Sequence, residues 1–327
     1  MNPSAKHGPA SDAKLPQEWR LRQQLRTRHL LLLQALSGES SLSQAARTLS
    51  ITQPAATKLL AQLEDLLQLP LFERLPRGLK PTEYGVIMIR HAQAALGEIG
   101  AARDALAQTL LGAQGRVSIG AVVGSLPQLT SPALAQLLAE QPRLSVSVTV
   151  ETSGTLVPML ERGELDLVVG QVPASVRADD LTFEALVHEP LELIASAEHP
   201  AQRRGRKRQL FLDNLMEDLW VLPPPASPLR MRVDAVFYAA GLALPLRVVE
   251  TASTLLATTL AQTTQKSVAV LSKEVARHYA QHPALRVLDL TLPGDLGTIG
   301  IVTRRRQRLS AAAANVVESL RRVASQT

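Results

Sequence analysis

The order of apolar and polar residues divides the chain into two parts at Gly112 to Gly115. Before this segment, from Arg28 to Leu111, apolar residues recur every three or four positions, which predicts helices almost throughout. From Arg116 onward, short runs rich in β-branched residues alternate with helical patterns. We therefore expect an α-helical N-terminal part and an α/β C-terminal part.

The C-terminal part opens with a strand-helix-strand-helix-strand pattern, which predicts a parallel sheet. Its expected strands are Val117 to Val123, Leu144 to Val150 and Leu165 to Val169, and its expected helices are Pro127 to Glu140 and Thr155 to Arg162. A second set of strands is expected at Leu191 to Ala195, Leu246 to Val249, Val268 to Leu271, Leu285 to Leu288 and Thr298 to Thr303, with helices at Pro228 to Ala240, Ser253 to Gln262 and Lys273 to Ala280. Two sets of strands predict two similar lobes.

Two short helices near residue 50 have the pattern of a helix-turn-helix. Leu42, Ala45, Ala46 and Leu49 form one apolar face, and Ser41 with Gln44 is a possible capping box at its start. A second helix is expected to begin after Thr52 as N-cap, with Pro54 in its first turn. Two helices of any small bundle would show the same pattern, so this feature does not decide the function by itself.

The exposed face of the second helix carries groups that suit the major groove of DNA. Gln53 is able to bond adenine, the methyl groups of Ala55, Ala56 and Thr57 to contact thymine, and Lys58 to reach phosphate or guanine. The following segment, FERLPRGLKPT from Phe72 to Thr82, places turn-forming residues between two short extended arms, as in a wing. Its Arg74, Arg77 and Lys80 are candidate phosphate contacts.

From about Arg28 to its end, the chain resembles a LysR-type transcriptional regulator. The resemblance is carried by Ser43-Gln44-Ala45-Ala46 with Leu49, Thr52-Gln53-Pro54-Ala55-Ala56-Thr57-Lys58, Leu63-Glu64, Pro70-Leu71-Phe72-Glu73-Arg74, Arg77-Gly78 and Thr82-Glu83-Tyr84-Gly85. Leu32 and Leu42 stand where the family usually has aromatic residues, and the first 24 residues or so are extra. Neither departure removes a group that faces the groove. The DNA-binding set is Ser43, Gln44, Thr52, Gln53, Pro54, Ala55, Thr57, Lys58, Arg74, Arg77 and Lys80.

The resemblance implies a domain plan. It consists of a disordered extension over residues 1–24, a winged helix-turn-helix over 25–82, a linker helix over 83–112, a first lobe over 116–180 plus 292–327, and a second lobe over 181–291. The two lobes are expected to have the fold of a type II periplasmic binding protein, with a small-molecule effector between them. The partners expected are a double-stranded DNA operator, a small organic effector, further copies of the chain as a dimer of dimers, and RNA polymerase.

The linker helix has an apolar stripe of its own. Ile89, Ala92, Leu96, Ile99, Leu106 and Leu110 follow alternating steps of three and four residues, interrupted by Arg103. This is the spacing of a coiled coil, and pairing would place two recognition helices on one duplex. Packing of the stripe against the sensing lobes of the same chain is the alternative.

The effector site is expected at the carboxyl ends of the parallel strands, where open α/β sheets bind ligands. Hydroxyl and amide side chains occur there in both lobes, and helix N-termini with hydroxyl groups suit anionic groups. The candidates are Ser125, Leu126, Thr152, Ser153, Gln171, Ser227, Thr251 and Ser253. For any single hydroxyl in this set, capping a helix without contacting ligand is the more common role.

Composition limits the other possibilities. The chain has 327 residues, 46% hydrophobic, 3% aromatic and no cysteine, which allows two or three domains and excludes disulfides, zinc thiolates and cysteine nucleophiles. A net charge of +6 permits a nucleic-acid partner without requiring one. The start of the chain is not a signal peptide, and no apolar run is long enough to span a bilayer, so a cytoplasmic protein without a cofactor is expected.

Other signals are weaker. Glu274, His278 and His282 have a helical spacing able to hold a metal, but a solvated helix face is favoured over a metal site. The basic runs Arg203 to Arg208 and Arg304 to Arg308 are expected to be exposed loops. Neither a nucleophile elbow nor a phosphate-binding loop is present, so the enzyme alternative has no motif in its favour. A solute-binding protein is the third alternative, but it would require a signal peptide and would have no use for a helix-turn-helix.

Overall fold

The structure is a computed structural model and describes residues 15–38, 41–75, 78–110, 115–173, 180–204, 210–225, 227–290, 292–293, 295–305 and 308–326. The chain divides into two compact units, Met1–Ala107 with Glu161–Glu164 and Gln108–Leu160 with Leu165–Thr327. The N-terminal unit has one hydrophobic core, and the C-terminal unit has more than one.

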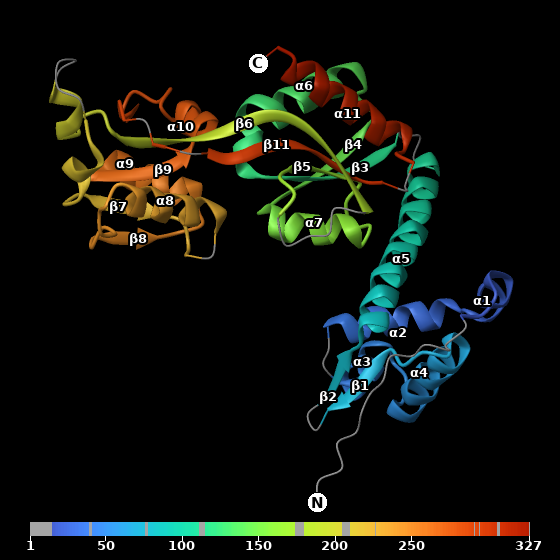
Figure 1. The fold of residues 1–327 in the computed structure, drawn as a ribbon. Coiled ribbons are helices and arrows are strands. Elements are labelled where there is room, and N and C mark those ends of the chain that lie inside the picture. The colour runs from blue at the N-terminus through green and yellow to red at the C-terminus, as the bar shows by residue number, and fades with distance from the viewer. Residues whose placement is uncertain are drawn as a thin grey trace, which may run out of the picture. The chain divides into compact units, whose positions relative to one another are not determined.

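The N-terminal unit contains helices and one two-stranded hairpin (Figure 1). Its elements are α1 (Glu18–Gln24), α2 (Thr27–Gly38), α3 (Leu42–Thr48), α4 (Gln53–Leu67), β1 (Phe72–Leu75), β2 (Gly78–Pro81) and α5 (Glu83–Leu110). Leu32, Leu63 and Leu71 are fully buried in its core, together with Ala45 and Ala46 of α3. Because these alanines are small, α3 is able to approach α4 closely, which is the arrangement expected of a helix-turn-helix.

Polar contacts fix the end of α4 to the hairpin. The carboxylate of Glu64 accepts hydrogen bonds from the backbone N–H groups of Leu71 and Phe72, at 2.7 and 3.1 Å. The hydroxyl of Thr82 donates to the Pro70 carbonyl at 2.8 Å and accepts from the Gly85 N–H at 3.1 Å. A Cβ atom at residue 85 would lie 2.0 Å from the Leu71 carbonyl oxygen, so only glycine allows this approach.

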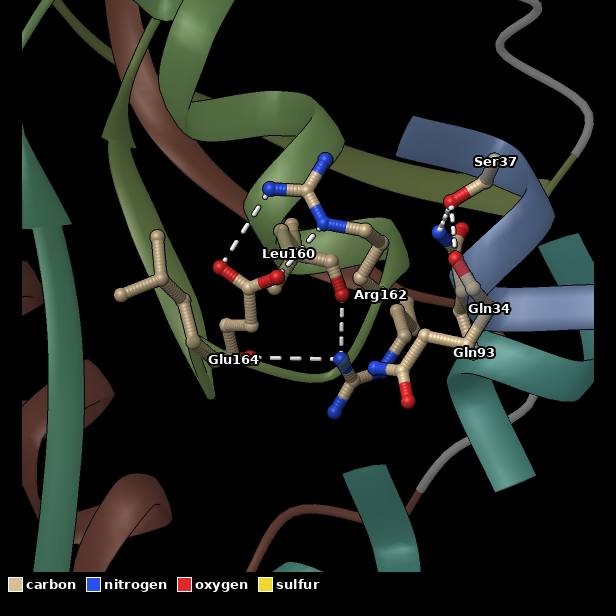
Figure 2. A network of polar contacts seen from close by, with 8 residues as sticks. Gln34, Ser37, Gln93, Leu160, Arg162 and Glu164 are labelled. Atoms are coloured by element: carbon tan, nitrogen blue, oxygen red, sulfur yellow. Dashed lines mark hydrogen bonds and ion pairs between the residues drawn. The ribbon is translucent and has the colours of Figure 1, made fainter. Parts of the chain in front are cut away.

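The first turns of α5 belong to the core of this unit, and its later turns do not. Ile89 and Ala92 are buried, and the Gln93 amide donates to the Ser37 hydroxyl at 2.9 Å, at the end of α2 (Figure 2). Ile99 and Leu106, further along the same stripe, are 55% and 68% exposed. The core of the N-terminal unit therefore covers only the start of the predicted apolar stripe.

Two details of the N-terminal unit differ from expectation. Residues 18–24, within the extension expected to be disordered, form α1, while residues 1–14 lie outside the described residues. Ser41 precedes α3 as N-cap, but its side chain makes no capping hydrogen bond, so the capping box with Gln44 is not formed. The N-cap predicted at Thr52 is confirmed, because its hydroxyl accepts a bond from the Ala55 N–H.

The C-terminal unit is built on a mixed sheet with the order β4-β3-β5-β11-β6-β9-β7-β8, and β10 pairs with β6. The strands are β3 (Arg116–Ala121), β4 (Ser145–Val150), β5 (Leu167–Gly170), β6 (Leu181–Ser196), β7 (Leu219–Leu222), β8 (Val248–Glu250), β9 (Ser267–Ser272), β10 (Leu285–Val287) and β11 (Asp295–Arg304). The helices are η1 (Val123–Ser125), η2 (Leu126–Thr130), α6 (Ser131–Glu140), α7 (Ser153–Glu161), η4 (Pro200–Arg204), η5 (Leu212–Leu215), α8 (Pro228–Ala239), α9 (Thr254–Thr263), α10 (Lys273–Tyr279) and α11 (Ala311–Ala324).

Separate cores divide this unit into two lobes. The first lobe packs α6, α7 and α11 around β3, β5 and β11, and the second packs α8, α9 and α10 around β7 and β9. The two long strands β6 and β11 pass between the lobes (Figure 1). Residues Leu181, Leu186 and Val187 of β6 belong to the first core, although a boundary at residue 181 would place them in the second lobe.

The sequence pattern missed two strands or parts of strands. The first half of β6, from Leu181 to Pro190, contains charged and exposed residues and was not expected to be a strand. β7 was also not expected, although its Trp220 is fully buried, lies edge-on to Phe237 at 5.0 Å and donates its indole N–H to the Leu215 carbonyl at 2.8 Å. The other expected strands and helices of both lobes are present, with bounds that differ by a few residues.

Candidate DNA-binding surface and effector site

The N-terminal end of α4 presents a polar surface. Thr52, Gln53, Pro54, Ala55 and Lys58 are exposed. Ala56, expected on the same face, is fully buried in the core, so the expected contact of its methyl group with thymine is wrong. Thr57 is half-buried, and its hydroxyl donates to the Gln53 carbonyl at 3.0 Å, which leaves its methyl group as the part available to a thymine. In a helix-turn-helix this end of the second helix enters the major groove.

The other DNA-binding candidates lie on α3 and on the hairpin. Ser43 is half-buried and Gln44 is exposed in the first turn of α3. Arg74 of β1 and Lys80 of β2 are exposed, and β1 pairs with β2 in antiparallel register, which is the expected wing. Arg77, expected at the tip of the wing, lies outside the described residues.

In the first lobe, three parallel strands direct their carboxyl ends to one edge. β3 pairs in parallel with both β4 and β5. The residues that follow these strands are those expected at the effector site: Ser125 and Leu126 after β3, Thr152 and Ser153 after β4, and Gln171 after β5.

Ser153 and Gln171 are directly bonded to each other. The Ser153 hydroxyl accepts a hydrogen bond from the Gln171 backbone N–H at 3.0 Å and lies 3.1 Å from the side-chain carbonyl oxygen of Gln171, to which it donates. The side-chain amide of Gln171 in turn donates to Glu189 at 2.7 Å. These three residues form a chain of hydrogen bonds that starts at the N-terminus of α7 and ends on β6.

Glu189 is a member of this chain that the sequence did not indicate. It is only 7% exposed and lies on β6 between His188 and Pro190, where the pairing with β11 shifts register. Its carboxyl lies against the backbone of Gly124, since a Cβ at residue 124 would be 1.6 Å from the carboxyl oxygen Oε1. Burial raises the pKa of Glu189 to about 7, and the hydrogen bond from Gln171 offsets part of that effect.

The remaining candidates of the first lobe are less connected to this group. The Ser125 hydroxyl is buried and donates to the Val122 carbonyl at 2.8 Å, with the Thr130 hydroxyl 2.9 Å away. It makes no capping bond at the start of η2, so the alternative role of helix cap does not apply to Ser125. Leu126 is half-buried, and Thr152 is exposed with its hydroxyl 3.4 Å from that of Thr155.

The candidates of the second lobe serve mainly as helix caps. The hydroxyls of Ser227 and Ser253 each accept a bond at 3.2 Å from the first turn of the following helix, and Thr251 accepts from the Ser253 N–H at 3.0 Å. Near Ser227 lies Arg230, which sequence reasoning missed. Its guanidinium is mostly buried and bonds Asp234 and Glu250, each at 2.8 Å.

Comparison with known protein families covers most of the chain. Residues 27–86 match the model for the bacterial regulatory helix-turn-helix protein of the lysR family, and residues 111–325 match the LysR substrate binding domain. The chain is 34% identical over 308 residues to the HTH-type transcriptional regulator GbpR of Azospirillum brasilense, spanning 94% of this chain and 89% of that protein. This protein belongs to the LysR-type transcriptional regulators.

As a LysR-type regulator, it combines a DNA-binding helix-turn-helix with a domain that binds effector ligands. It is 28% identical over 305 residues to the regulator PcaQ of Agrobacterium fabrum strain C58, covering 93% of this chain and 96% of PcaQ. Its fold is shared by full-length OxyR from Pseudomonas aeruginosa, with a TM-score of 0.57, 21% identity, and coverage of 90% of this chain and 97% of that one. It is also shared by full-length CbnR in complex with its target DNA, with a TM-score of 0.54, 20% identity, and coverage of 91% and 100%.

Weaker sequence signals have plain structural explanations in this regulator. Helix α10 ends at Tyr279, so His282 does not continue the helical spacing of Glu274 and His278. In the run expected to be an exposed loop, Arg305 is exposed as expected, whereas Arg304 is half-buried at the end of β11. Arg304 donates to the carbonyls of Leu160 and Leu165, and Arg305 to that of Leu181 (Figure 2 shows the carbonyl of Leu160). In the other basic run, residues 205–209 lie outside the described residues. Among the described helices, none has both the length and the apolar character needed to span a membrane.

Proposed function

We propose that this regulator reads its operator with the exposed face of α4 and anchors itself to the phosphate backbone through the wing. The observation that supports this assignment is the exposure of Gln53 and Lys58 at the start of a helix whose other face is buried. Thr52, Pro54, Ala55 and Thr57 complete the surface on α4, and Ser43 and Gln44 of α3 lie beside the backbone of the duplex. Arg74, Arg77 and Lys80 contact phosphates.

The effector, in the same proposal, binds between the lobes at the carboxyl ends of the strands. β6 leaves the first lobe near the end of β5, from which β11 separates it, and enters the second lobe opposite Ser272, at the end of β9. The carboxyl ends of the strands in both lobes are therefore adjacent to the same stretch of β6. Ser125, Leu126, Thr152, Ser153 and Gln171 contribute from the first lobe, and Ser227, Thr251 and Ser253 from the second.

The regulator acts as a homo-oligomer, a dimer of dimers, that pairs through the stripe of α5. Ile99 and Leu106 are exposed large apolar residues on one helix, which favours pairing with a second copy. Binding of effector shifts operator binding or promoter activation by its differential affinity for two arrangements of the oligomer. The same proposal places the regulator in the cytoplasm, where it contacts RNA polymerase at the promoter.

One experiment tests both halves of the proposal, using matched pairs of variants. Lys58→Ala is expected to weaken operator binding by about 1 to 3 kcal/mol, whereas Lys266→Ala, an equal loss of charge at an exposed position in the C-terminal unit, leaves it unchanged. Ser153→Ala is expected to shift the effector dose-response of a promoter reporter, whereas Ser310→Ala removes only the cap of α11. Equal gel-shift affinities for Lys58→Ala and Lys266→Ala would refute the DNA-binding assignment. Equal dose-responses for Ser153→Ala and Ser310→Ala would refute the effector site.

A further inference from the structure

The polar group around Glu189 brings together residues from four separate segments. Gln171 follows β5, Ser153 begins α7, Gly124 lies in η1, and Ser272 ends β9 of the second lobe. A Cβ at residue 124 would lie 1.6 Å from the Glu189 carboxyl and 3.2 Å from the Ser272 hydroxyl oxygen, so both groups border the same point. α10, which begins after Ser272, contacts η1. The carboxyl of Glu189 is therefore placed where the two lobes meet.

This group has unused hydrogen-bonding capacity. The hydroxyl oxygen of Ser272 is buried and has no hydrogen-bond partner within the described residues, although it is near enough to Glu189 to favour the charged carboxylate. Glu189 Oε2 is bonded by Gln171, and its other oxygen faces Gly124. Buried polar atoms normally find partners, so an unpartnered hydroxyl beside a carboxyl indicates a place for a ligand atom.

The chemistry of the group selects among ligand classes. Burial already disfavours the charged form of the Glu189 carboxyl. A ligand carboxylate or phosphate would place a second negative charge beside it, which disfavours that form further. In the second lobe, the buried guanidinium of Arg230 is already bonded to two acidic residues, Asp234 and Glu250. An ammonium group only donates hydrogen bonds, so it would pair with the charged carboxylate but would accept nothing from the Ser272 hydroxyl. A hydroxyl both donates and accepts.

We propose that Glu189 determines effector specificity, and that it selects an uncharged ligand with a hydroxyl group at this point over an acid of the same size. A ligand hydroxyl donates to the Glu189 carboxyl and accepts from Ser272 or Gln171. The proposal rests on the effector site proposed above, and assigns to it a ligand class and a residue that the sequence did not indicate.

The test uses purified full-length regulator and matched sets of probes. Each set contains a sugar alcohol, the aldonate of the same carbon skeleton and the corresponding 1-amino compound, for example sorbitol, gluconate and glucamine, and the panel extends to pentoses and hexoses. Binding is measured by calorimetry and by the shift in melting temperature. The wild type is expected to bind at least one neutral member, and to bind it at least about tenfold more tightly than its aldonate.

Two variants separate the role of Glu189 from general effects. Glu189→Gln, which removes the charge and keeps the shape, is expected to reduce the preference over the aldonate about tenfold or more, whereas Glu217→Gln, the same change at an exposed site, leaves it unchanged. Gly124→Ala is expected to displace the Glu189 carboxyl and to weaken binding of the neutral ligand. The added Cβ would meet Glu189 Oε1, which is the end of a flexible side chain and is therefore able to move. If Glu189→Gln does not fold, the binding measured with Gly124→Ala tests the role of Glu189 in its place.

Several results would overturn the proposal: tighter binding of aldonates or amines by the wild type, an unchanged preference in Glu189→Gln and Gly124→Ala, or no binding of any neutral member. Failure of the ligand class is distinguishable from failure of the site. If an acid binds and Ser153→Ala weakens it, the effector site stands and the class is wrong. If the bound compound is insensitive to Ser153→Ala and does not alter operator binding, the proposed site fails too.

Discussion

The two candidate sites of this regulator use polar side chains in opposite ways. On α4, Gln53 and Lys58 are exposed, whereas in the C-terminal unit Ser125, Ser153 and Glu189 are buried and bonded to or packed against their neighbours. A surface that meets DNA needs groups that water solvates until the partner arrives. A site that encloses a small ligand needs groups whose direction is set by the surrounding fold. Mutations are therefore expected to act on affinity alone in the first site and on both affinity and stability in the second.

The largest effect is expected where an exposed apolar residue is assigned to a subunit interface. Leu106→Glu would place an unpaired carboxylate in an apolar seam, at a cost of several kcal/mol, and shift the oligomer toward monomer. DNA binding should weaken too, because two linked recognition helices bind better than one. Light scattering measures the mass, and Leu246→Glu, at a position 98% exposed, is the control. A wild-type mass for Leu106→Glu would argue against the seam.

The next effect is the dependence of stability on pH that arises from Glu189. Its folded pKa is raised from 4.5 to about 7, so its stabilising contribution is complete below the unfolded value and is lost as pH rises through about 7. A shift of that size corresponds to roughly 3 kcal/mol. Relative to Glu189→Gln, the wild type should thus lose stability between pH 5 and pH 8.

This measurement is best made as a difference between the two proteins across pH, by thermal or urea unfolding. Burial and the adjacent Arg28 and Arg26 lower the pKa of His29 in the N-terminal unit, so protonation of His29 destabilises that unit as pH falls. That contribution is the same in both proteins and cancels. Parallel stability curves for wild type and Glu189→Gln would contradict the burial of an ionisable carboxyl at this position.

A smaller effect, confined to affinity, is expected for the wing. Replacing Arg74 and Lys80 together by Ala should weaken operator and non-specific DNA binding alike by about 1 to 2 kcal/mol, and should lower the slope of log affinity against log salt by about 0.9 for each phosphate that is no longer neutralised. Melting temperature should not change, because both side chains are exposed. Titrations at several salt concentrations supply the slope, and a selective loss for the operator sequence would instead indicate that these side chains read bases.

The smallest effect distinguishes a helix cap from a ligand contact. Ser253→Ala removes the bond from the Leu256 N–H and should cost about 1 kcal/mol of stability. If Ser253 also contacts the effector, the dose-response of a reporter should shift more than it does for Ser310→Ala, which removes an equivalent cap from α11. Equal responses of the two variants would limit Ser253 to capping.

Local patterns were sufficient for the helix-turn-helix and for most strands. The apolar steps of α3 and α4, the N-cap at Thr52 and the two extended arms of the wing are properties of short segments, and the structure contains each of them. The carboxyl-end positions of Ser153 and Gln171 also followed from the order of strands and helices alone. By contrast, Trp220 and its strand were missed, because a four-residue strand buried on both faces has no alternating pattern.

The amino-acid sequence by itself thus determined the family, the two kinds of domain, the exposed polar end of α4 and the edge of the sheet where a ligand is expected. Only the tertiary structure decided which polar residues meet there. Glu189 is 18 residues from Gln171 in the chain and far from both Gly124 and Ser272, and a lone Glu before a Pro has no pattern that marks it as buried. Its burial, its partners and its raised pKa all result from β6 crossing between two lobes, because desolvation and hydrogen bonding depend on distances in space and not on spacing along the chain.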